Sequence, residues 1–259
     1  MNGKSIGFVG GGRVTRIILA GWQKAGAVPS PIVVSDTSEA ALAAVKAQCP
    51  QVRTALHGNA DAAGQDIVFL AVHPPVLAEV VAQIKPGLKS SALLVSLAPK
   101  FTIARLSSLL AGFARIARAI PNAPTIVAAG YNPIALAPSL PDADKQTILD
   151  LWRPLGDCPL VAEEKLEAYA ILTAMGPTYF WYQFYELCSL AESFGLTAQE
   201  AHSGLEKMLI GAIRTMLQSG LSAEQVKDLI PVKPLADAEA SMVEMYRTRL
   251  AGVMQKIKP

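Results

Sequence analysis

The sequence contains few cysteines and histidines, and neither residue type is arranged as a disulfide framework or a metal site. Its three cysteines, Cys49, Cys158 and Cys188, are far apart and form no C-x-x-C pair. Such isolated cysteines usually serve as small apolar residues, and their thiols stay reduced in a reducing compartment. The three histidines show no metal-ligand spacing. We therefore expect a cytoplasmic protein that holds no metal.

Charge and long apolar runs are also scarce. Charged residues make up 17% of the 259 residues, the net charge is +2, and there is no basic block, which argues against binding to nucleic acid or to an anionic membrane. No uninterrupted apolar run approaches the ~20 residues that cross a bilayer. The first apolar stretch is interrupted by glycines and by Arg13, unlike a signal peptide. Hydrophobic residues nevertheless make up 51% of the chain, which predicts large buried surfaces and suggests a subunit interface.

The N-terminal stretch organises the rest of the chain. A short apolar strand is predicted at Ile6–Val9 and leads into three glycines, Gly10, Gly11 and Gly12, and then into a stretch with helical apolar spacing. This layout holds dinucleotides, because the glycines let the backbone approach a pyrophosphate and the helix N-terminus offers free N–H groups. The pattern matches G-x-G-x-x-G/A, except that Thr15 stands at the third glycine position.

The second predicted strand, at residues 31–35, ends at Asp36. An acid at this place usually accepts hydrogen bonds from the adenosine ribose hydroxyls, which favours NAD because a 2′-phosphate would be repelled. The hydroxyl of Ser35 and the guanidinium of Arg13 would instead suit a phosphate, so NADP stays open. Asp36 could also be a plain cap for the next predicted helix, with Ser38 as the alternative cap.

Strands and helices alternate over the first part of the chain. The apolar runs at residues 66–72 and 91–97 are typical of parallel strands that are buried on both faces. The alternation predicts an α/β fold with a Rossmann-type, doubly wound and mostly parallel sheet over residues 1–159, with ligands at the carboxyl ends of the strands. Further strands are predicted at residues 52–55 and 115–120, and helices at residues 13–24, 40–47, 59–63, 75–84, 102–110 and 142–152.

The remaining residues, 160–259, read as an all-helical domain. Helices are predicted over residues 197–219, 223–229 and 235–257, and aromatic residues crowd Tyr179–Tyr185. With the helix that carries this aromatic segment, that makes four helices in about a hundred residues, which cannot bury such apolar faces by themselves. We therefore expect a dimerisation domain that makes a homodimer through the C-terminal helices. The aromatic cluster fits a core or an interface better than a cofactor stack.

Short segments spread over nearly the whole chain carry a family resemblance. They are IGFVGGG (6–12), VFLAVHP (68–74), RAIPNAP (118–124), GPTY (176–179), SLAESFGL (189–196), GAIRTMLQSG (211–220) and VKDLI (226–230). Together they resemble the pyrroline-5-carboxylate reductase family. The resemblance implies an N-terminal nicotinamide-binding domain, a helical domain that interlocks with a partner chain, and hydride transfer from NADPH or NADH to a cyclic imine, giving proline. It favours NADP, whereas Asp36 leaves NAD open.

Carried over by position, the resemblance implies a cofactor site built from several loops. Gly10 and Gly12 would hold the pyrophosphate, Asn59 would approach the adenosine ribose, and Asn122 would lie near the nicotinamide. Each position also has an ordinary structural explanation, such as a turn cap or core packing. The candidate cofactor residues are Gly10, Gly11, Gly12, Arg13, Val14, Ser35, Asp36, Asn59, Ala71, Val72, Pro74, Ser96 and Asn122.

The substrate half departs from the family pattern. After VKDLI the family reads S-P-G-G-T-T, whose amides and hydroxyls bind the substrate carboxylate and imine nitrogen, but this chain reads IPVKPLAD over Ile230–Asp237. Its two prolines have no N–H to donate, although both substrate groups need donors in a partly dry site. Thr173, Tyr179 and Lys233 are the candidate catalytic residues that could replace them. Lys233 could equally be a solvated loop lysine, and Tyr179 a structural hydrogen-bonding group.

The sequence therefore predicts an NAD(P)H-dependent oxidoreductase that transfers hydride to a C=N or C=O bond of a small anionic substrate in a remodelled pocket. One alternative is a catalytically silent NAD(P)-binding or sensor protein that acts through its helical dimer. A second alternative is a genuine pyrroline-5-carboxylate reductase of proline biosynthesis, in which other residues replace the lost loop.

Overall fold

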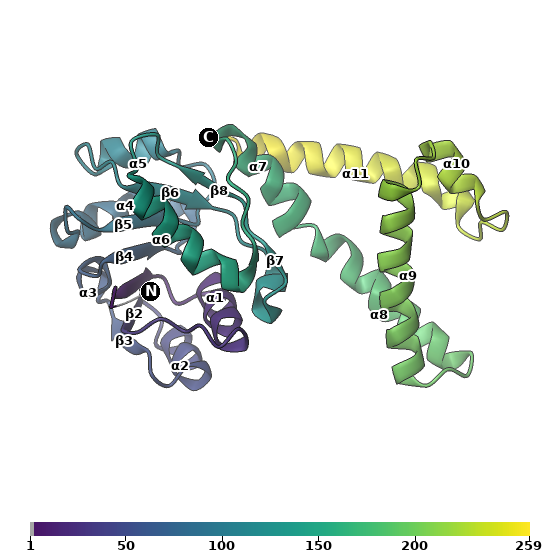
Figure 1. Cartoon of the computed structure of the whole chain (residues 1–259), viewed down its shortest axis with the longest axis horizontal. Coiled ribbons are helices and arrows are strands. Elements are labelled where there is room, and N and C mark those ends of the chain that lie inside the picture. The colour runs from purple at the N-terminus through teal and green to yellow at the C-terminus, as the bar shows by residue number, and fades with distance from the viewer. Residues whose placement is uncertain (1–2) are drawn as a thin grey trace. The chain divides into compact units, whose positions relative to one another are not determined.

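A computed structural model describes residues 3–259. These residues fall into two compact units, residues 3–175 with 253–259 and residues 176–252. The predicted boundary at residue 159 lies inside the first unit, and the division into functional domains stays a prediction. In Figure 1 the first unit holds the sheet and the second consists of helices.

The first unit is built on a seven-stranded sheet in the order β3-β2-β1-β4-β5-β6-β8 (Figure 1). Every neighbouring pair is parallel except β6 with β8, which is antiparallel. The strand order reverses between β1 and β4, which makes this point the topological switch of the sheet. The strands are β1 (Ile6–Val9), β2 (Ile32–Asp36), β3 (Arg53–Leu56), β4 (Ile67–Leu70), β5 (Leu93–Ser96), β6 (Ile116–Ala119) and β8 (Ile134–Leu136), while β7 (Gly130–Tyr131) pairs with β9 (Gly156–Asp157) in a separate ribbon.

Helices connect these strands, and the predicted elements are confirmed to within a few residues. The helices of the first unit are α1 (Arg13–Lys24), α2 (Glu39–Gln48), α3 (Asn59–Ala63), α4 (Pro74–Ile84), α5 (Ile103–Leu109), α6 (Asp142–Trp152) and α7 (Leu166–Tyr169). Short 3₁₀ turns lie at Lys85–Gly87, Ala123–Val127, Arg153–Leu155 and Glu163–Lys165, and a π-helical turn at Ala170–Ala174 follows α7. The strands β7, β8 and β9 were not predicted, because two or three residues are too few to show a periodicity.

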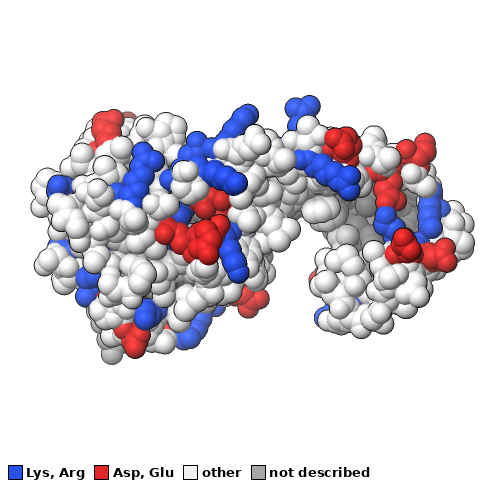
Figure 2. Space-filling model, turned by 90° about the horizontal axis from the view of Figure 1, so that it is seen from above, with Lys and Arg blue, Asp and Glu red and all other residues white. Residues whose placement is uncertain are grey.

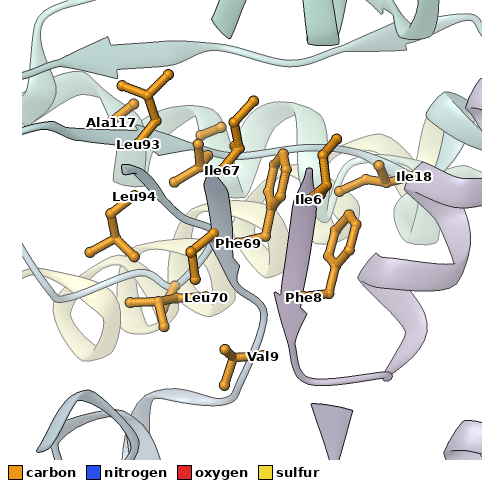
Figure 3. Close-up of a cluster of buried hydrophobic side chains, with 14 of the residues drawn as sticks. Ile6, Phe8, Val9, Ile18, Ile67, Phe69, Leu70, Leu93, Leu94 and Ala117 are labelled. Atoms are coloured by element: carbon orange, nitrogen blue, oxygen red, sulfur yellow. The ribbon is translucent and has the colours of Figure 1, made fainter. Parts of the chain in front are cut away.

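The core of the first unit is centred on β1 and β4. Phe8 of β1 stacks on Phe69 of β4 with ring centroids 4.6 Å apart, and Figure 3 shows both rings among the other buried side chains of the two strands. Trp22 meets both rings edge-on, and its indole N–H donates to the carbonyl of Leu151 at 2.8 Å, which ties α1 to α6. Burying each such side chain contributes roughly 1.5–3 kcal/mol. The two strands that flank the switch point are therefore held rigidly.

All the regular secondary structure described in the second unit is helical, as predicted. It contains α8 (Pro177–Ser193), α9 (Ala198–Gln218) and α10 (Ala223–Asp228), and α11 (Ala236–Ile257) begins in it. Of the residues described in these four helices, Ala201 alone is buried. Tyr185 and Phe194 are 78% and 80% exposed. The apolar faces are thus present but uncovered, and the pairing with a second copy stays a prediction.

The surface carries both charge signs. On the face drawn in Figure 2, basic and acidic residues are interspersed and no extended area is only basic. Within residues 3–259, every helix falls short of the length and apolarity that a membrane span requires. The same residues contain no cluster of three or more His, Cys, Asp or Glu side chains fit to hold a metal ion.

Candidate functional site

The glycine turn between β1 and α1 is tightly constrained on one side and open on the other. Gly10 has φ +110°, and a Cβ there would lie 2.6 Å from the carbonyl oxygen of Ala71, so the turn requires glycine at this place. Around Gly12 a Cβ would meet nothing within 4 Å, and no side chain caps the start of α1 at that residue. The N–H groups of the first helical turn therefore face open space, where a helix N-terminus binds an anion.

Thr15 fits the place of the third glycine for a specific reason. Its side chain is fully buried, and its hydroxyl donates to the carbonyl oxygen of Gly10 at 2.5 Å. A buried hydroxyl without a hydrogen-bond partner would be costly. The hydroxyl of Thr15 avoids this cost because the glycine turn itself supplies the acceptor. The departure from the glycine pattern leaves the turn intact.

Asp36 ends β2 and is fixed by two backbone hydrogen bonds. Its Oδ2 accepts from the N–H of Gly11 at 2.7 Å, and its Oδ1 accepts from the N–H of Ser38 at 2.8 Å. The alternative that Asp36 caps α2 is wrong, because the Ser38 hydroxyl caps that helix by accepting from the N–H of Ala41 at 3.2 Å. The carboxylate therefore belongs to the glycine turn.

A cavity of about 190 Å³ opens beside this carboxylate. It lies at the carboxyl ends of β1, β2 and β4, which is the switch point where open α/β sheets bind ligands. Four of the predicted cofactor residues, from four different segments, meet here. The lining consists of Gly10, Asp36, Thr37, Asn59, Val72, Val76, Glu79, Val80 and Gln83.

A chain of side-chain hydrogen bonds runs along the cavity from β2 to α4. The Ser35 hydroxyl donates to Asn59 Oδ1 at 2.8 Å, and Asn59 Nδ2 donates to Gln83 Oε1 at 2.7 Å. Gln83 Nε2 in turn donates to Glu79 Oε1 at 3.1 Å. Ser35 is buried, and its hydroxyl donates to Asn59, so Ser35 orients the side-chain amide of Asn59.

Sequence reasoning missed the contribution of α4 to the cavity. Val76, Glu79, Val80 and Gln83 line it, although none was a candidate. Their spacing of three and four residues places them on one face of the helix that follows β4. That spacing, on a helix directly after the strand beside β1, was the available signal.

The other candidates lie near the carboxyl ends of the sheet or on the first turn of α1. Ala71 follows β4 and donates its N–H to the carbonyl of Val9 at 2.8 Å, and Pro74 is the first residue of α4. Arg13, which is exposed, and Val14 begin α1. These positions agree with a ligand that lies across the edge of the sheet, but the role of each residue stays a prediction.

The next two strands contribute Ser96 and Asn122, both of which are buried. Ser96 ends β5, and its hydroxyl oxygen accepts from the N–H of Ala98 at 3.4 Å. Asn122 follows β6, and its Oδ1 accepts from the N–H of Tyr131 at 3.0 Å. Both side chains thus shape their own loops, as the structural explanation for Asn122 anticipated.

The three candidate catalytic residues are divided between the two units, one in the first and two in the second. Thr173 belongs to the π-helical turn of the first unit, and its hydroxyl donates to the carbonyl of Tyr169 at 2.8 Å. Tyr179 lies in the second unit beside Tyr246, with 6.0 Å between the ring centroids. Burial is the main cause that raises the pKa of Tyr179, and the nearby Tyr246 adds to it. Lys233 is exposed in the loop between α10 and α11. Their catalytic roles stay predictions.

A buried ion cluster stabilises a neighbouring part of the first unit. Arg118 of β6 pairs with Glu163 at 2.9 Å and with Glu167 at 2.6 Å. Glu163 also accepts from the N–H of Ile103 at 2.6 Å, and Glu167 from the N–H of Lys100 at 3.4 Å. The cluster therefore ties the loop between β5 and α5 to the segment that follows the sheet.

Comparison with known proteins agrees with this architecture. Residues 5–100 match the family model described as NADP oxidoreductase coenzyme F420-dependent. The chain is 27% identical over 228 residues to pyrroline-5-carboxylate reductase of Escherichia coli K12, covering 88% of this chain and 84% of that protein. It is 25% identical over 231 residues to the reductase of Methanosarcina acetivorans, covering 89% and 85%.

Solved structures extend the similarity to both units. A pyrroline-5-carboxylate reductase from Coxiella burnetii is 28% identical with a TM-score of 0.69, covering 99% of this chain and 95% of that one. Plasmodium falciparum pyrroline carboxylate reductase with NADP bound has a TM-score of 0.74 at 20% identity, with the same coverage, and shows the shared fold. The predicted Rossmann-type sheet followed by helices is confirmed. The similarity to pyrroline-5-carboxylate reductases therefore covers the glycine turn, the sheet and the helices alike.

Proposed function

We propose that this chain is an NAD(P)H-dependent oxidoreductase that transfers hydride to the C=N or C=O bond of a small anionic substrate. The observation that carries the proposal is the glycine turn at the switch point, with Asp36 and Asn59 beside the cavity. Dinucleotides bind at such a place in doubly wound sheets. The relatives are named pyrroline-5-carboxylate reductases, and one of them was solved with NADP bound, which supports a nicotinamide cofactor.

The residues of the first unit would hold the cofactor as follows. Gly10, Gly11 and Gly12 would let the pyrophosphate approach the N-terminus of α1, where backbone N–H groups are free of side-chain caps. Asp36 and Asn59 would receive the adenosine ribose. Ala71, Val72 and Pro74, with Ser96 and Asn122 beyond them, would border the nicotinamide, which supplies the hydride when the cofactor is bound.

The substrate pocket would differ from that of the family in the loop between α10 and α11. Ile230 and Val232 are 67% and 72% exposed there, and Pro231 and Pro234 have no N–H to offer. The cation of this loop is Lys233. A hydrogen bond from Lys227 is the main cause that lowers the pKa of Glu239, and the charge of Lys233 adds a smaller effect in the same direction. We propose that Lys233 attracts the anionic group of the substrate in place of a glycine-rich donor loop.

The exposed helices support a homodimer. Trp181 and Phe184 of α8 and Leu209 of α9 line a cavity of about 270 Å³ on the second unit, together with Tyr185 and His202. Large apolar surfaces of this kind are rarely left in water by a monomer. The occupant we propose is the same region of a second copy, because closed twofold assemblies bury identical faces against each other.

The direct test is the oxidation of NADPH and NADH by the purified chain with pyrroline-5-carboxylate, followed at the nicotinamide absorbance. Turnover in the usual range of ~1 to 10³ per second would support the genuine reductase, with the lost donors replaced. Turnover only with other cyclic imines or oxo acids would support the remodelled pocket. Cofactor binding without turnover across the panel would favour the silent alternative. Failure to bind either cofactor would overturn the proposal.

A charge variant tests the substrate side. If Lys233 attracts the substrate anion, Lys233→Gln raises KM about tenfold or more while kcat changes less. Lys207→Gln, on the exposed surface of α9, is the matched control because it removes the same charge elsewhere in the helical unit. Equal kinetics for the two variants would contradict the proposed role of Lys233.

A further inference from the structure

We infer that this chain uses NADH in preference to NADPH. The inference rests on the proposed function and names the cofactor of that site. The two cofactors differ at the adenosine ribose, where NADPH carries a 2′-phosphate and NADH a hydroxyl. The residues that face this position therefore decide between them.

The carboxylate of Asp36 is oriented to accept a hydroxyl. Its two oxygens each accept one backbone N–H, from Gly11 at 2.7 Å and from Ser38 at 2.8 Å. An ionised carboxylate oxygen has room for a further hydrogen bond, and Asp36 lines the cavity. A ribose hydroxyl can donate there. A phosphate, which carries about −1.5 to −2 charges at neutral pH, brings acceptors and repulsion instead.

The surroundings of Asp36 strengthen this choice. Glu79 is a second carboxylate on the cavity wall, and among the described residues that line the cavity there is no Lys or Arg. Glu79 accepts from Gln83, which in turn accepts from Asn59, so the acid belongs to the ordered wall. A 2′-phosphate would therefore meet two negative groups in the cavity and no cation that compensates them.

The nearby arginines do not change this balance. Arg53 on β3 pairs with Asp61 at 2.9 Å. Arg13 is exposed on the first turn of α1, directly after Gly12, and is not part of the cavity wall. As the first residue of α1 it lies where the pyrophosphate, which both cofactors share, would bind in the proposed site. The NADP found in the Plasmodium falciparum relative therefore does not decide the preference of this chain.

The experiment is an equilibrium titration of the full chain with NADH and with NADPH, followed by nicotinamide fluorescence without any substrate. We expect NADH to bind at least tenfold more tightly, and the difference to narrow as salt is raised, because salt screens the repulsion. Asp36→Asn is expected to tighten NADPH binding at least tenfold and to weaken NADH binding a few-fold. Glu79→Gln is expected to tighten NADPH binding by a smaller factor than Asp36→Asn does, and to change NADH binding less than NADPH binding.

Controls separate the possible outcomes. Asp142→Asn removes an acid from the exposed first turn of α6 and should change neither affinity. Equal or tighter binding of NADPH by the parent chain would overturn the inference and leave the proposed function standing. An Asp36→Asn variant that weakens both cofactors alike would also overturn it, because the carboxylate would then only shape the turn. Binding of neither cofactor would overturn the proposed function itself.

Discussion

The two units of this chain use their apolar residues in different ways. In the first unit, strands such as β1 and β4 are completely buried, and the aromatic rings of Phe8 and Phe69 stack inside the sheet layer. In the second unit, aromatic residues of α8 such as Trp181 and Tyr185 remain 44% and 78% exposed. The comparison teaches that an apolar sequence pattern predicts that the apolar face of a helix or strand will be covered. The pattern does not say whether the same chain or another molecule covers that face.

This difference also separates two requirements for activity. The candidate cofactor cavity is lined by residues of the first unit, so we expect variants in the helices α8 to α10 to change dinucleotide binding little. For the exposed helices of the second unit, by contrast, we proposed a second copy that removes their apolar surface from water. Variants in each unit should therefore affect different measurements.

The strongest effect is expected from charges placed on the exposed helical surface. Replacing both Tyr185 and Phe194 by glutamate would place unpaired charges in the proposed dimer interface, which is costly. We expect the dimer to become a monomer at micromolar concentration in sedimentation velocity, while NADH binding is retained. Leu109→Glu, on the surface of α5, should leave the assembly unchanged. A parent chain that is already monomeric would contradict the proposed pairing.

The next effect concerns the stability of the first unit. Arg118→Met leaves Glu163 and Glu167 without their guanidinium partner, and breaking a buried pair typically costs about 3–5 kcal/mol. The loss is measured by urea unfolding followed by tryptophan fluorescence in a Trp181→Phe background. The signal then comes from Trp22 and Trp152, which are buried in the first unit. Arg153→Met removes an exposed pair and should cost less than about 1 kcal/mol. Equal losses for both variants would show that burial of the cluster contributes little.

A smaller change tests the glycine turn. Gly10→Ala adds a Cβ at φ +110° and 2.6 Å from the Ala71 oxygen, so the turn must shift away from the geometry that admits a pyrophosphate. We expect dinucleotide affinity to fall about a hundredfold in the fluorescence titration, with the circular dichroism spectrum retained. Gly64→Ala is the control, because its Cβ would make ordinary contacts at 3.5 Å. If Gly10→Ala binds like the parent, the site lies elsewhere.

The smallest effect is a pH dependence at the start of the sheet. Hydrogen bonds from Lys89 and from Ser5 lower the pKa of Asp66 to about 2. Because the folded pKa lies below the unfolded value of ~3.9, this stabilisation is complete above about pH 4 and is lost as the pH falls towards 2. Asp66→Asn should lower the free energy of unfolding by up to about 1 kcal/mol at neutral pH, since the pair is partly exposed. Parent and variant should converge in urea titrations near pH 2; parallel curves would contradict this linkage.

The elements of the first unit were predictable because each has a strong local pattern. The buried strands β4 and β5 are continuous apolar runs, and the helix α5 begins with a capping residue, Thr102, whose hydroxyl accepts from the N–H of Arg105. The short strand β8 was not predictable, since its pairing with β6 is set by contacts far away in the sequence. Local pattern thus gave the framework but not its antiparallel edge.

The candidate site was predicted in part. Gly10, Asp36 and Asn59 line one cavity because strand order brings the ends of β1 and β2 and the start of α3 together. The choice between Asp36 and Ser38 as the cap of α2 depended on the N–H of Gly11, which competes for the carboxylate and is distant in sequence. Glu79 and Gln83 were not candidates because their helical spacing shows that they share a face of α4, whereas the fold shows that this face lines the cavity.

The path of α11 has a consequence for the order in which the protein is made. This helix begins in the second unit and ends in the first, where Ile257 packs against the core. Residues 253–259 are therefore synthesised after the whole helical unit, although they complete the sheet unit. A nascent chain exposes the apolar faces of α8 and α9 before the first unit has received its last segment, so chaperone contact during synthesis is expected to concentrate on the helices.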